Sequence, residues 1–384
     1  MSPNIGFWLR SETSGTCCGQ AGRRVSCYGV YPMRLFTPWR TPGSSAWRCL
    51  GGEQAPLVVQ FEVLEKLGEV DPAAAWYAFN ARPPALGLAR LDPAAGRKVL
   101  AGPRAYVGFS NVVGSNTARR TEGGYVLNGG WPVVSGSPCA AWFFLTATTT
   151  GETVAHGRAE VLPADVRNLF VPAEAVTVED TWYASAMRAT ASNAVSVADS
   201  FVPDELVTSR LLQPARYDDA LYRVPPAMAL QPGVAAVMLG MARGALNALV
   251  ALSSSRFSAA RRVMLREVPR VGEIVGEAEA NLRSARLLFY EAARSVAAAA
   301  ENGGVPQSVR APMWAAHFHA LTVAVAVGDA VYEAGGVDSL LDACPIGGFW
   351  KDLHGLAQGR QMWCQTEVDV GRSYMGIDPL DPRF

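Results

Sequence analysis

Apolar residues recur every three or four positions through the second half of the chain, and this spacing constrains the fold more than any other feature. After Pro232, one set runs from Val234 to Leu252 and a second runs from Val271 to Phe289. That period places apolar side chains on one face of a helix. Two further helical segments, 313–334 and 351–375, bring the count to four, so we predict a C-terminal antiparallel four-helix bundle.

Short β-prone runs broken by turn residues occupy the middle of the chain, between about Tyr106 and Pro203. The clearest are residues 123–131, 142–149, 167–172 and 194–202. Side chains alternate along a strand, so every second residue from Val195 to Phe201 is predicted to share one face. An antiparallel β domain of roughly 100 residues fits this region.

The N-terminal part divides into two segments. Residues 1–50 hold four of the seven cysteines and show no sustained apolar spacing, so we assign them no element. From Leu57 onward apolar residues again share a helical face, and Asp71-Pro72 has the pattern of a helix N-cap followed by proline at the first helical position. The predicted divisions are an atypical segment, a helical domain, a β domain and the bundle: 1–50, 51–104, 105–208 and 209–384.

Composition and charge exclude several classes of function. Lys plus Arg and Asp plus Glu both number 34, so no net positive field is available to hold nucleic acid. The sequence has no Cys-x-x-Cys, which argues against a zinc site or a disulfide framework. No run of about 18 uninterrupted apolar residues occurs, so we expect no membrane span. A reduced cytoplasmic location is the expectation.

Two loops combine an indole with small hydroxyl residues. Residues 131–136 read Trp-Pro-Val-Val-Ser-Gly after a glycine-rich hairpin, and residues 187–193 read Met-Arg-Ala-Thr-Ala-Ser-Asn shortly after Trp182. Such surfaces suit a flat heteroaromatic ring that stacks and finds hydrogen-bond partners. The structural alternative stays open: Trp131 is a core residue of the β domain and Ser135 caps a turn.

The order of these motifs resembles the acyl-CoA dehydrogenase superfamily, and within it the oxygenase components of two-component flavin monooxygenases such as the hydroxyphenylacetate and hydroxysecosteroid hydroxylases. The resemblance covers about residues 50–384. It rests on these phrases in their order: residues 51–53, 71–76, 123–136, 180–182, 187–193, 201–203 and 351–354.

The resemblance implies a fold, a cofactor and partners. The fold is α+β and acyl-CoA dehydrogenase-like: an N-terminal helical region, a middle antiparallel β-barrel domain and a C-terminal four-helix bundle. The cofactor is FMN or FAD, reduced by a separate flavin reductase and bound between the β domain and the bundle. The protein is expected to be a homotetramer that hydroxylates a small aromatic or polycyclic substrate with O2.

The resemblance also assigns site residues. Trp131, Ser135 and Gly136 are expected against the isoalloxazine, with Ser135 near its N5 edge. Thr190, Ser192 and Asn193 are expected beside the flavin ring or its phosphate.

His354 is the candidate catalytic base, because it lies in the C-terminal motif and histidine titrates near neutrality. A structural role on its helix is the alternative. Relatives typically carry a second histidine five positions later, where this chain has Gly359. The chain also has alanines, such as Ala191, where the family often has glycine.

Two other functions stay open at this point. A true acyl-CoA dehydrogenase needs a carboxylate base, for which Glu367 is a weak candidate because the usual Glu-Gly-Thr is absent. A catalytically impaired paralogue that acts as a structural subunit would account for Gly359.

Overall fold

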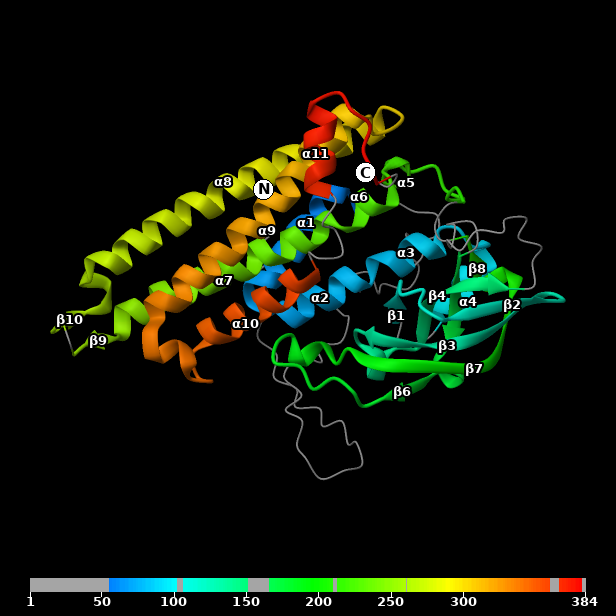
Figure 1. Cartoon of the computed structure of the whole chain (residues 1–384), viewed down its shortest axis with the longest axis horizontal. Coiled ribbons are helices and arrows are strands. Elements are labelled where there is room, and N and C mark those ends of the chain that lie inside the picture. The colour runs from blue at the N-terminus through cyan, green and yellow to red at the C-terminus, as the bar shows by residue number, and fades with distance from the viewer. Residues whose placement is uncertain are drawn as a thin grey trace.

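Helices from both ends of the chain form one elongated body, and the strands between them form a sheet beside it (Figure 1). The computed structural model describes residues 55–101, 106–150, 166–209, 213–259, 261–359 and 366–381. The predicted order of helical region, β domain and helical bundle is confirmed. The atypical segment 1–50 lies outside the described residues.

Among residues 55–101, four helices precede the sheet: α1 (Leu57–Val70), α2 (Pro72–Asn80), α3 (Arg82–Leu88) and α4 (Pro93–Leu100). The predicted face of α1 is confirmed, since Leu57, Phe61 and Leu64 are buried. The predicted cap is also confirmed: the Asp71 carboxylate accepts the backbone N–H groups of residues 73 and 74 at 2.9 and 3.0 Å. This cap fixes the start of α2, which lies between the bundle and the sheet (Figure 1).

One mixed sheet forms the β domain. Its strands are β1 (Val107–Ser110), β2 (Thr117–Thr121), β3 (Gly124–Val134), β4 (Trp142–Thr150), β5 (Val166–Pro172), β6 (Thr177–Glu179), β7 (Asn193–Pro203) and β8 (Val207–Thr208). The order is β6-β7-β3-β2-β4-β5-β8, and β1 also pairs with β4. The expectation of purely antiparallel strands is wrong in two places, because β1 and β2 both run parallel to β4. After β3 the chain crosses to the far side of β2 instead of turning back in a hairpin, so β4 arrives parallel.

A β-bulge overturns the predicted alternation along β7. Val195 and Val197 are buried as expected, but Phe201 is 53% exposed and its neighbour Val202 is buried. Between the pairs Leu127–Ser200 and Gly129–Val197, the chain advances by three residues along β7 but by only two along β3. Asp199 takes the extra place with φ +48°. One added residue moves every following side chain to the opposite face.

The C-terminal helices form the bundle. They are α5 (Ala220–Arg223), α6 (Pro226–Leu230), α7 (Pro232–Ser255), α8 (Pro269–Glu301), α9 (Gln307–Gly335), α10 (Pro345–Ala357) and α11 (Thr366–Tyr374), with a small hairpin of β9 (Phe257–Ser258) and β10 (Val263–Met264) between α7 and α8. The apolar positions predicted on α8 are buried. The predicted single helix over 351–375 is wrong, because α10 already begins at Pro345 and ends at Ala357, and α11 is a separate helix.

Glycines allow α1 to lie directly against α7. A Cβ on Gly68 would stand 2.4 Å from the Val237 carbonyl oxygen, and one on Gly240 would stand 2.0 Å from the carbonyl oxygen of Glu65. These distances are too short for any side chain, so the two helices meet backbone to backbone.

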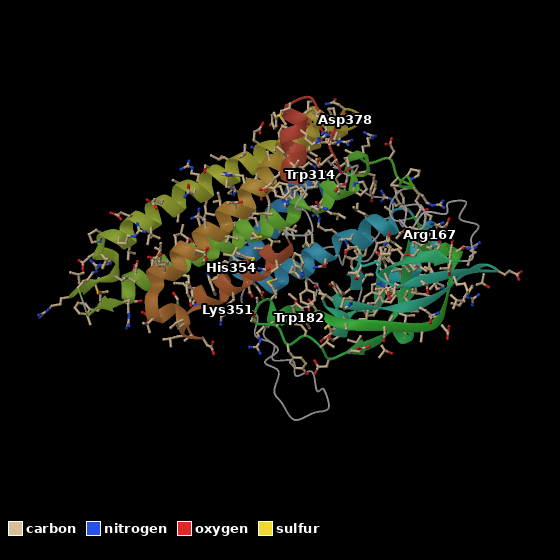
Figure 2. All side chains as sticks on the ribbon, in the orientation of Figure 1. Arg167, Trp182, Trp314, Lys351, His354 and Asp378 are labelled. Carbon is tan, nitrogen blue, oxygen red and sulfur yellow. The ribbon has the colours of Figure 1, made fainter. Side chains whose placement is uncertain are left out.

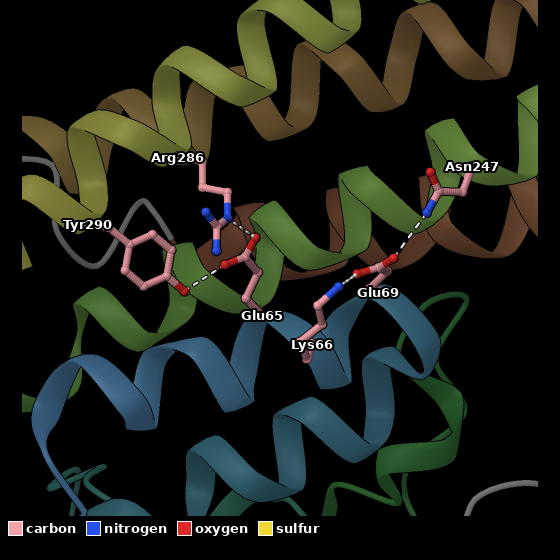
Figure 3. Close-up of polar contacts among 6 residues, drawn as sticks. All are labelled: Glu65, Lys66, Glu69, Asn247, Arg286 and Tyr290. Carbon is pink, nitrogen blue, oxygen red and sulfur yellow. Dashed lines mark hydrogen bonds and ion pairs between the residues drawn. The ribbon is translucent and has the colours of Figure 1, made fainter. Parts of the chain in front are cut away.

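Buried charge then ties α1 to α8 (Figure 3). The Glu65 carboxylate accepts the Arg286 Nε–H at 2.7 Å and the Tyr290 hydroxyl at 2.6 Å. Glu65 is only 8% exposed, so both of its oxygens need these donors. A second, exposed link on α1 joins Lys66 and Glu69, and Glu69 accepts from Asn247 of α7.

Two helical stretches within the described residues are long and apolar enough to cross a bilayer by length and composition: Pro226–Ser255 and Gln307–Leu340. Protein covers 72% of the most apolar window of the first, so packing inside the bundle accounts for its composition. For the second the covered share is 39%.

Candidate active site at the junction of sheet and helices

Three hydroxyl residues meet where the end of β3 and the start of β7 approach the helical body. We call Ser135, Thr190 and Ser192 the hydroxyl cluster. Ser135 follows β3, and the other two precede the first residues of β7. The Ser135 and Ser192 Oγ atoms are 2.8 Å apart, and Ser192 Oγ lies 2.7 Å from Thr190 Oγ1. Ser135 is 6% exposed and the other two less, so water is largely excluded from these contacts.

Helix α2 covers the cluster with an indole. Trp76 donates its Nε1–H to Ser135 Oγ at 3.0 Å and stacks on Phe79 with ring centroids 4.8 Å apart. The sequence pattern missed Trp76 as a site residue, because 59 positions separate it from Ser135 and only the folded domains bring them together.

Gly136 is required by the turn itself. Its φ is +72°, and a Cβ there would stand 2.4 Å from the rings of both Tyr77 and Tyr106. Its N–H donates to the Thr190 carbonyl at 2.8 Å, which joins the two loops of the cluster. Burial raises the pKa of both tyrosines, so their phenols are neutral and the site carries no phenolate.

The loop before β7 is strained and is held at both ends. Met187 and Ala191 have φ of +50° and +43°, a conformation that costs a residue with a Cβ about 1–2 kcal/mol. Asn193 accepts the backbone N–H groups of Thr181 and Trp182 on Oδ1, both at 3.0 Å. The structure therefore gives Asn193 a loop-fixing role.

Helix α10 fixes the other end of this loop through Asp352. The Asp352 carboxylate accepts the Met187 N–H, and a Cβ on Gly355 would lie 2.7 Å from that of Ala186. Burial raises the pKa of the Asp352 carboxyl, and the nearby Asp71 carboxylate raises it further against the lowering effect of the Met187 N–H. Asp352 lies within the phrase 351–354, but the sequence pattern gave it no role at the site.

Trp131 is not at the surface of this site, which corrects the expectation of an indole against a ligand ring. Its side chain is 0% exposed in the core of the β domain, and its Nε1–H donates to the Thr146 carbonyl at 2.9 Å. Trp131 sits on the inward face of β3, where a large apolar side chain stabilises the sheet by burial. The indole of the cluster is that of Trp76.

His354 faces α9. Its Nε2 lies 2.7 Å from Asp329 Oδ1, which also accepts the Trp350 Nε1–H at 2.7 Å. Successive helical residues turn by about 100°, so His354 points about 200° away from Asp352, which faces the loop. Figure 2 shows Trp182 at the end of the sheet domain that meets α10, the helix carrying Lys351 and His354. The structure does not bring His354 into contact with the hydroxyl cluster of its own chain.

Two other positions from the sequence analysis lie at the bundle. Gly359 follows α10, and no described atom lies within 4 Å of a Cβ built there. Glu367 is exposed on α11, which packs on α9.

An apolar cavity of about 400 Å³ lies between the end of α7 and residues 338–345, at the end of the bundle away from the sheet. Two of its lining residues are polar, and both are engaged: Asp338 pairs with Arg256 at 2.7 Å, and the Ser255 hydroxyl donates to the Leu252 carbonyl.

Several known proteins are similar to this chain over most of its length. Residues 232–362 match the family described as acyl-CoA dehydrogenase, C-terminal domain. An indole-3-acetate monooxygenase from Pseudomonas putida is 26% identical over 356 residues, which cover 92% of this chain and 86% of that protein. HsaA, the oxygenase subunit of a flavin-dependent monooxygenase from Mycobacterium tuberculosis, is 26% identical over 341 residues, 86% of this chain and 84% of its own.

Solved structures show the same fold. XiaF from a Streptomyces species, in complex with FADH2 and glycerol, superposes with a TM-score of 0.75 at 25% identity and covers 86% of this chain and 84% of its own. TdsC from a Paenibacillus species, with FMN and indole, gives a TM-score of 0.67 at 21% identity over 85% and 84%. The acyl-CoA dehydrogenase-like fold and the resemblance to oxygenase components of flavin-dependent monooxygenases are confirmed.

Proposed function

We propose that this acyl-CoA dehydrogenase-like chain is the oxygenase component of a two-component flavin-dependent monooxygenase that hydroxylates a small aromatic substrate. The observation that carries the proposal is similarity over most of the chain to oxygenases of this kind. An enzyme of this class takes reduced flavin from a separate reductase. Relatives bind FADH2 or FMN, and either is proposed here.

The hydroxyl cluster fits a flavin by its chemistry. Ser135 Oγ accepts one hydrogen bond from Trp76 and retains capacity for another, and it lies at the junction where the resemblance expects the ring. We propose Ser135 as the ring contact, with Gly136 shaping the turn beside it. Thr190, Ser192 and Asn193 then support this contact from the facing loop.

Bound reduced flavin supplies the two electrons with which O2 is activated. The residues of the chain exclude water and fix position: Trp76 covers Ser135, and Asp352 holds the loop that carries Thr190. The three hydroxyl residues are themselves buried, which suits chemistry that stray water would divert.

We propose His354 as the group that takes a proton from an acidic substrate such as a phenol. Asp329 fixes the orientation of the ring through its contact at 2.7 Å, as a carboxylate commonly does for a histidine base. Because His354 faces away from the cluster of its own chain, it would act on a substrate held near α10 or in a neighbouring copy.

A homotetramer in the cytoplasm is the proposed state of the protein. The apolar stretch Gln307–Leu340 supports association, since only 39% of its most apolar window is covered within one chain. Sedimentation of the purified protein would test this state, and a monomer at micromolar concentration would contradict it.

The function is tested with purified protein, reduced FMN or FAD and 18O2, using indole and simple phenols as substrates. We expect a hydroxylated product that carries the labelled oxygen, against H2O2 alone in a reaction without protein. A protein that co-purifies with oxidised FAD and bleaches with an acyl-CoA would instead be a dehydrogenase. A protein that binds neither reduced flavin would overturn the proposal.

A further inference from the structure

In the hydroxyl cluster each hydroxyl donates to the next one in the same order. The contact of Thr190 with Met187 shows which hydroxyl is the donor at each step. Thr190 Oγ1 lies 2.8 Å from the Met187 carbonyl oxygen. A carbonyl can only accept, so this contact is a hydrogen bond only when Thr190 donates its hydrogen to Met187. The same carbonyl also accepts the Trp182 Nε1–H and the Thr190 backbone N–H, each at 3.1 Å, and these bonds hold this end of the cluster in place.

Every other hydroxyl hydrogen then has only one place to go. Because Thr190 gives its hydrogen away, Ser192 must donate to Thr190 across their 2.7 Å contact. Ser192 has no second hydrogen, so Ser135 must donate to Ser192. At the other end the Trp76 Nε1–H donates to Ser135. Ser135 is therefore left with no hydrogen to give, and with one lone pair able to accept.

Reversing the direction costs a hydrogen bond. If Ser135 turned its hydrogen toward a ligand, Ser192 would have to donate to Ser135 and Thr190 to Ser192. Thr190 Oγ1 and the Met187 oxygen would then face each other at 2.8 Å with no hydrogen between them. The Met187 carbonyl keeps its two N–H donors, so the net cost is one buried hydrogen bond together with the repulsion of two oxygens at that distance.

We propose that Thr190 and Ser192 are positioning residues that hold Ser135 as a pure hydrogen-bond acceptor and so select the oxidation state of the ring bound there. This inference rests on the proposed function. Reduced flavin carries a hydrogen on N5 and can donate to Ser135, whereas the N5 of oxidised flavin can only accept. Thr190 and Ser192 thus act through Ser135, where the sequence analysis expected them beside the ring or its phosphate.

The preference corresponds to one buried hydrogen bond. We expect the wild-type protein to bind reduced flavin about tenfold more tightly than oxidised flavin, a factor equivalent to about 1.4 kcal/mol. In Thr190→Val the terminal donation is gone, so Ser192 can donate to Ser135 and Ser135 can donate outward without loss. Both ring states then make equally many hydrogen bonds, and the tenfold ratio should fall to within about twofold.

The experiment is a pair of titrations with FMN and with FAD, anaerobic for the reduced form, that yields the ratio of the two dissociation constants for each variant. Thr190→Ser keeps the hydroxyl and should keep the ratio. Ser137→Ala removes a hydroxyl of the same turn that is bonded to the Ala191 carbonyl and not to the cluster, so it should also keep the ratio. Ser192→Ala cuts the chain at another point and should lower the ratio as Thr190→Val does, which covers a failure of either variant to fold.

The outcomes separate the two proposals. A ratio near one in the wild type, or an unchanged ratio in Thr190→Val and Ser192→Ala, overturns this inference and leaves the proposed function standing. Binding of neither flavin form overturns both. A ratio lost in the two chain variants and kept in Thr190→Ser and Ser137→Ala supports the inference.

Discussion

Removing the Tyr290 hydroxyl should weaken the attachment of α1 to α8 by an amount that the structure defines. Tyr290→Phe deletes the 2.6 Å bond to Glu65 but keeps the ring, which packs edge-on against Phe289 with centroids 5.3 Å apart. Arg286 still pairs with Glu65 at 2.7 Å. The loss is therefore confined to one hydrogen bond to a buried carboxylate.

A hydrogen bond to a charged group contributes about 1.5–3 kcal/mol to the free energy of unfolding. Glu65 is 8% exposed, so water cannot replace the lost donor and the effect should reach about 2 kcal/mol. The matched control is Tyr183→Phe. Tyr183 donates to Asp180 at 2.9 Å, but it is 82% exposed, and its loss should stay within about 0.5 kcal/mol.

Urea unfolding followed by tryptophan fluorescence and circular dichroism measures both variants, with coincidence of the two signals as the check on two-state behaviour. The reasoning is refuted if Tyr290→Phe is no less stable than Tyr183→Phe. In that case the hydrogen bond from Arg286 alone would be enough to stabilise the buried Glu65 carboxylate.

The pH dependence gives an independent check. Burial first, and then the Glu65 carboxylate, raise the pKa of Tyr290 above its ordinary value of 10.0. A group whose pKa is raised by folding contributes stability below its unfolded pKa and loses it as pH rises beyond that value. The difference between wild type and Tyr290→Phe should therefore narrow above about pH 10, and a constant difference would contradict the assigned cause.

Three further predictions concern the site. Ala191→Gly should raise the free energy of unfolding by about 1 kcal/mol, because glycine adopts φ +43° without strain; a lower thermal midpoint would argue against stored strain in this loop. Gly136→Ala should cost more than about 2 kcal/mol by urea unfolding, since a Cβ there combines a φ of +72° with contacts of 2.4 Å to two tyrosine rings; a near-neutral effect would mean that the turn relaxes freely. Asp352→Asn keeps an oxygen that accepts the Met187 N–H but removes the carboxyl group. Because folding raises the pKa of this carboxyl, the wild type loses stability as pH rises above the ordinary value of 3.8, so at pH 7 the variant should be at least as stable as wild type. Marked destabilisation of the variant in urea would show that the negative charge itself is needed.

The sequence predicted best those elements whose signal is local and periodic. The buried faces of α1 and α8, and the Asp71 cap of α2, follow from spacing and from side-chain chemistry within a few residues. Strand positions were equally accessible, since β4, β5 and β7 lie within one or two residues of the predicted runs.

What the sequence could not predict depends on pairing between distant segments. The extra residue at Asp199 is visible only against β3, so the face of Phe201 was predicted wrongly. Trp131 and Trp76 both suit a ligand surface by residue type, and only the fold shows which one is in the core and which one meets Ser135. The role of Asp352 likewise depends on a contact with Met187 across 165 positions.

The glycine contact between α1 and α7 has a consequence for how the molecule assembles. The helical body is built from two separate parts of the sequence. Helix α1 precedes the strands of the sheet and α7 follows them, so the sheet is an insertion within the helical body. Bringing α1 and α7 together closes a long loop of chain, which costs conformational entropy. Contacts between residues so far apart in the sequence also slow folding. A fragment that begins at Pro232 would lack α1, which packs against α7. We therefore expect productive folding only after most of the chain has been synthesised.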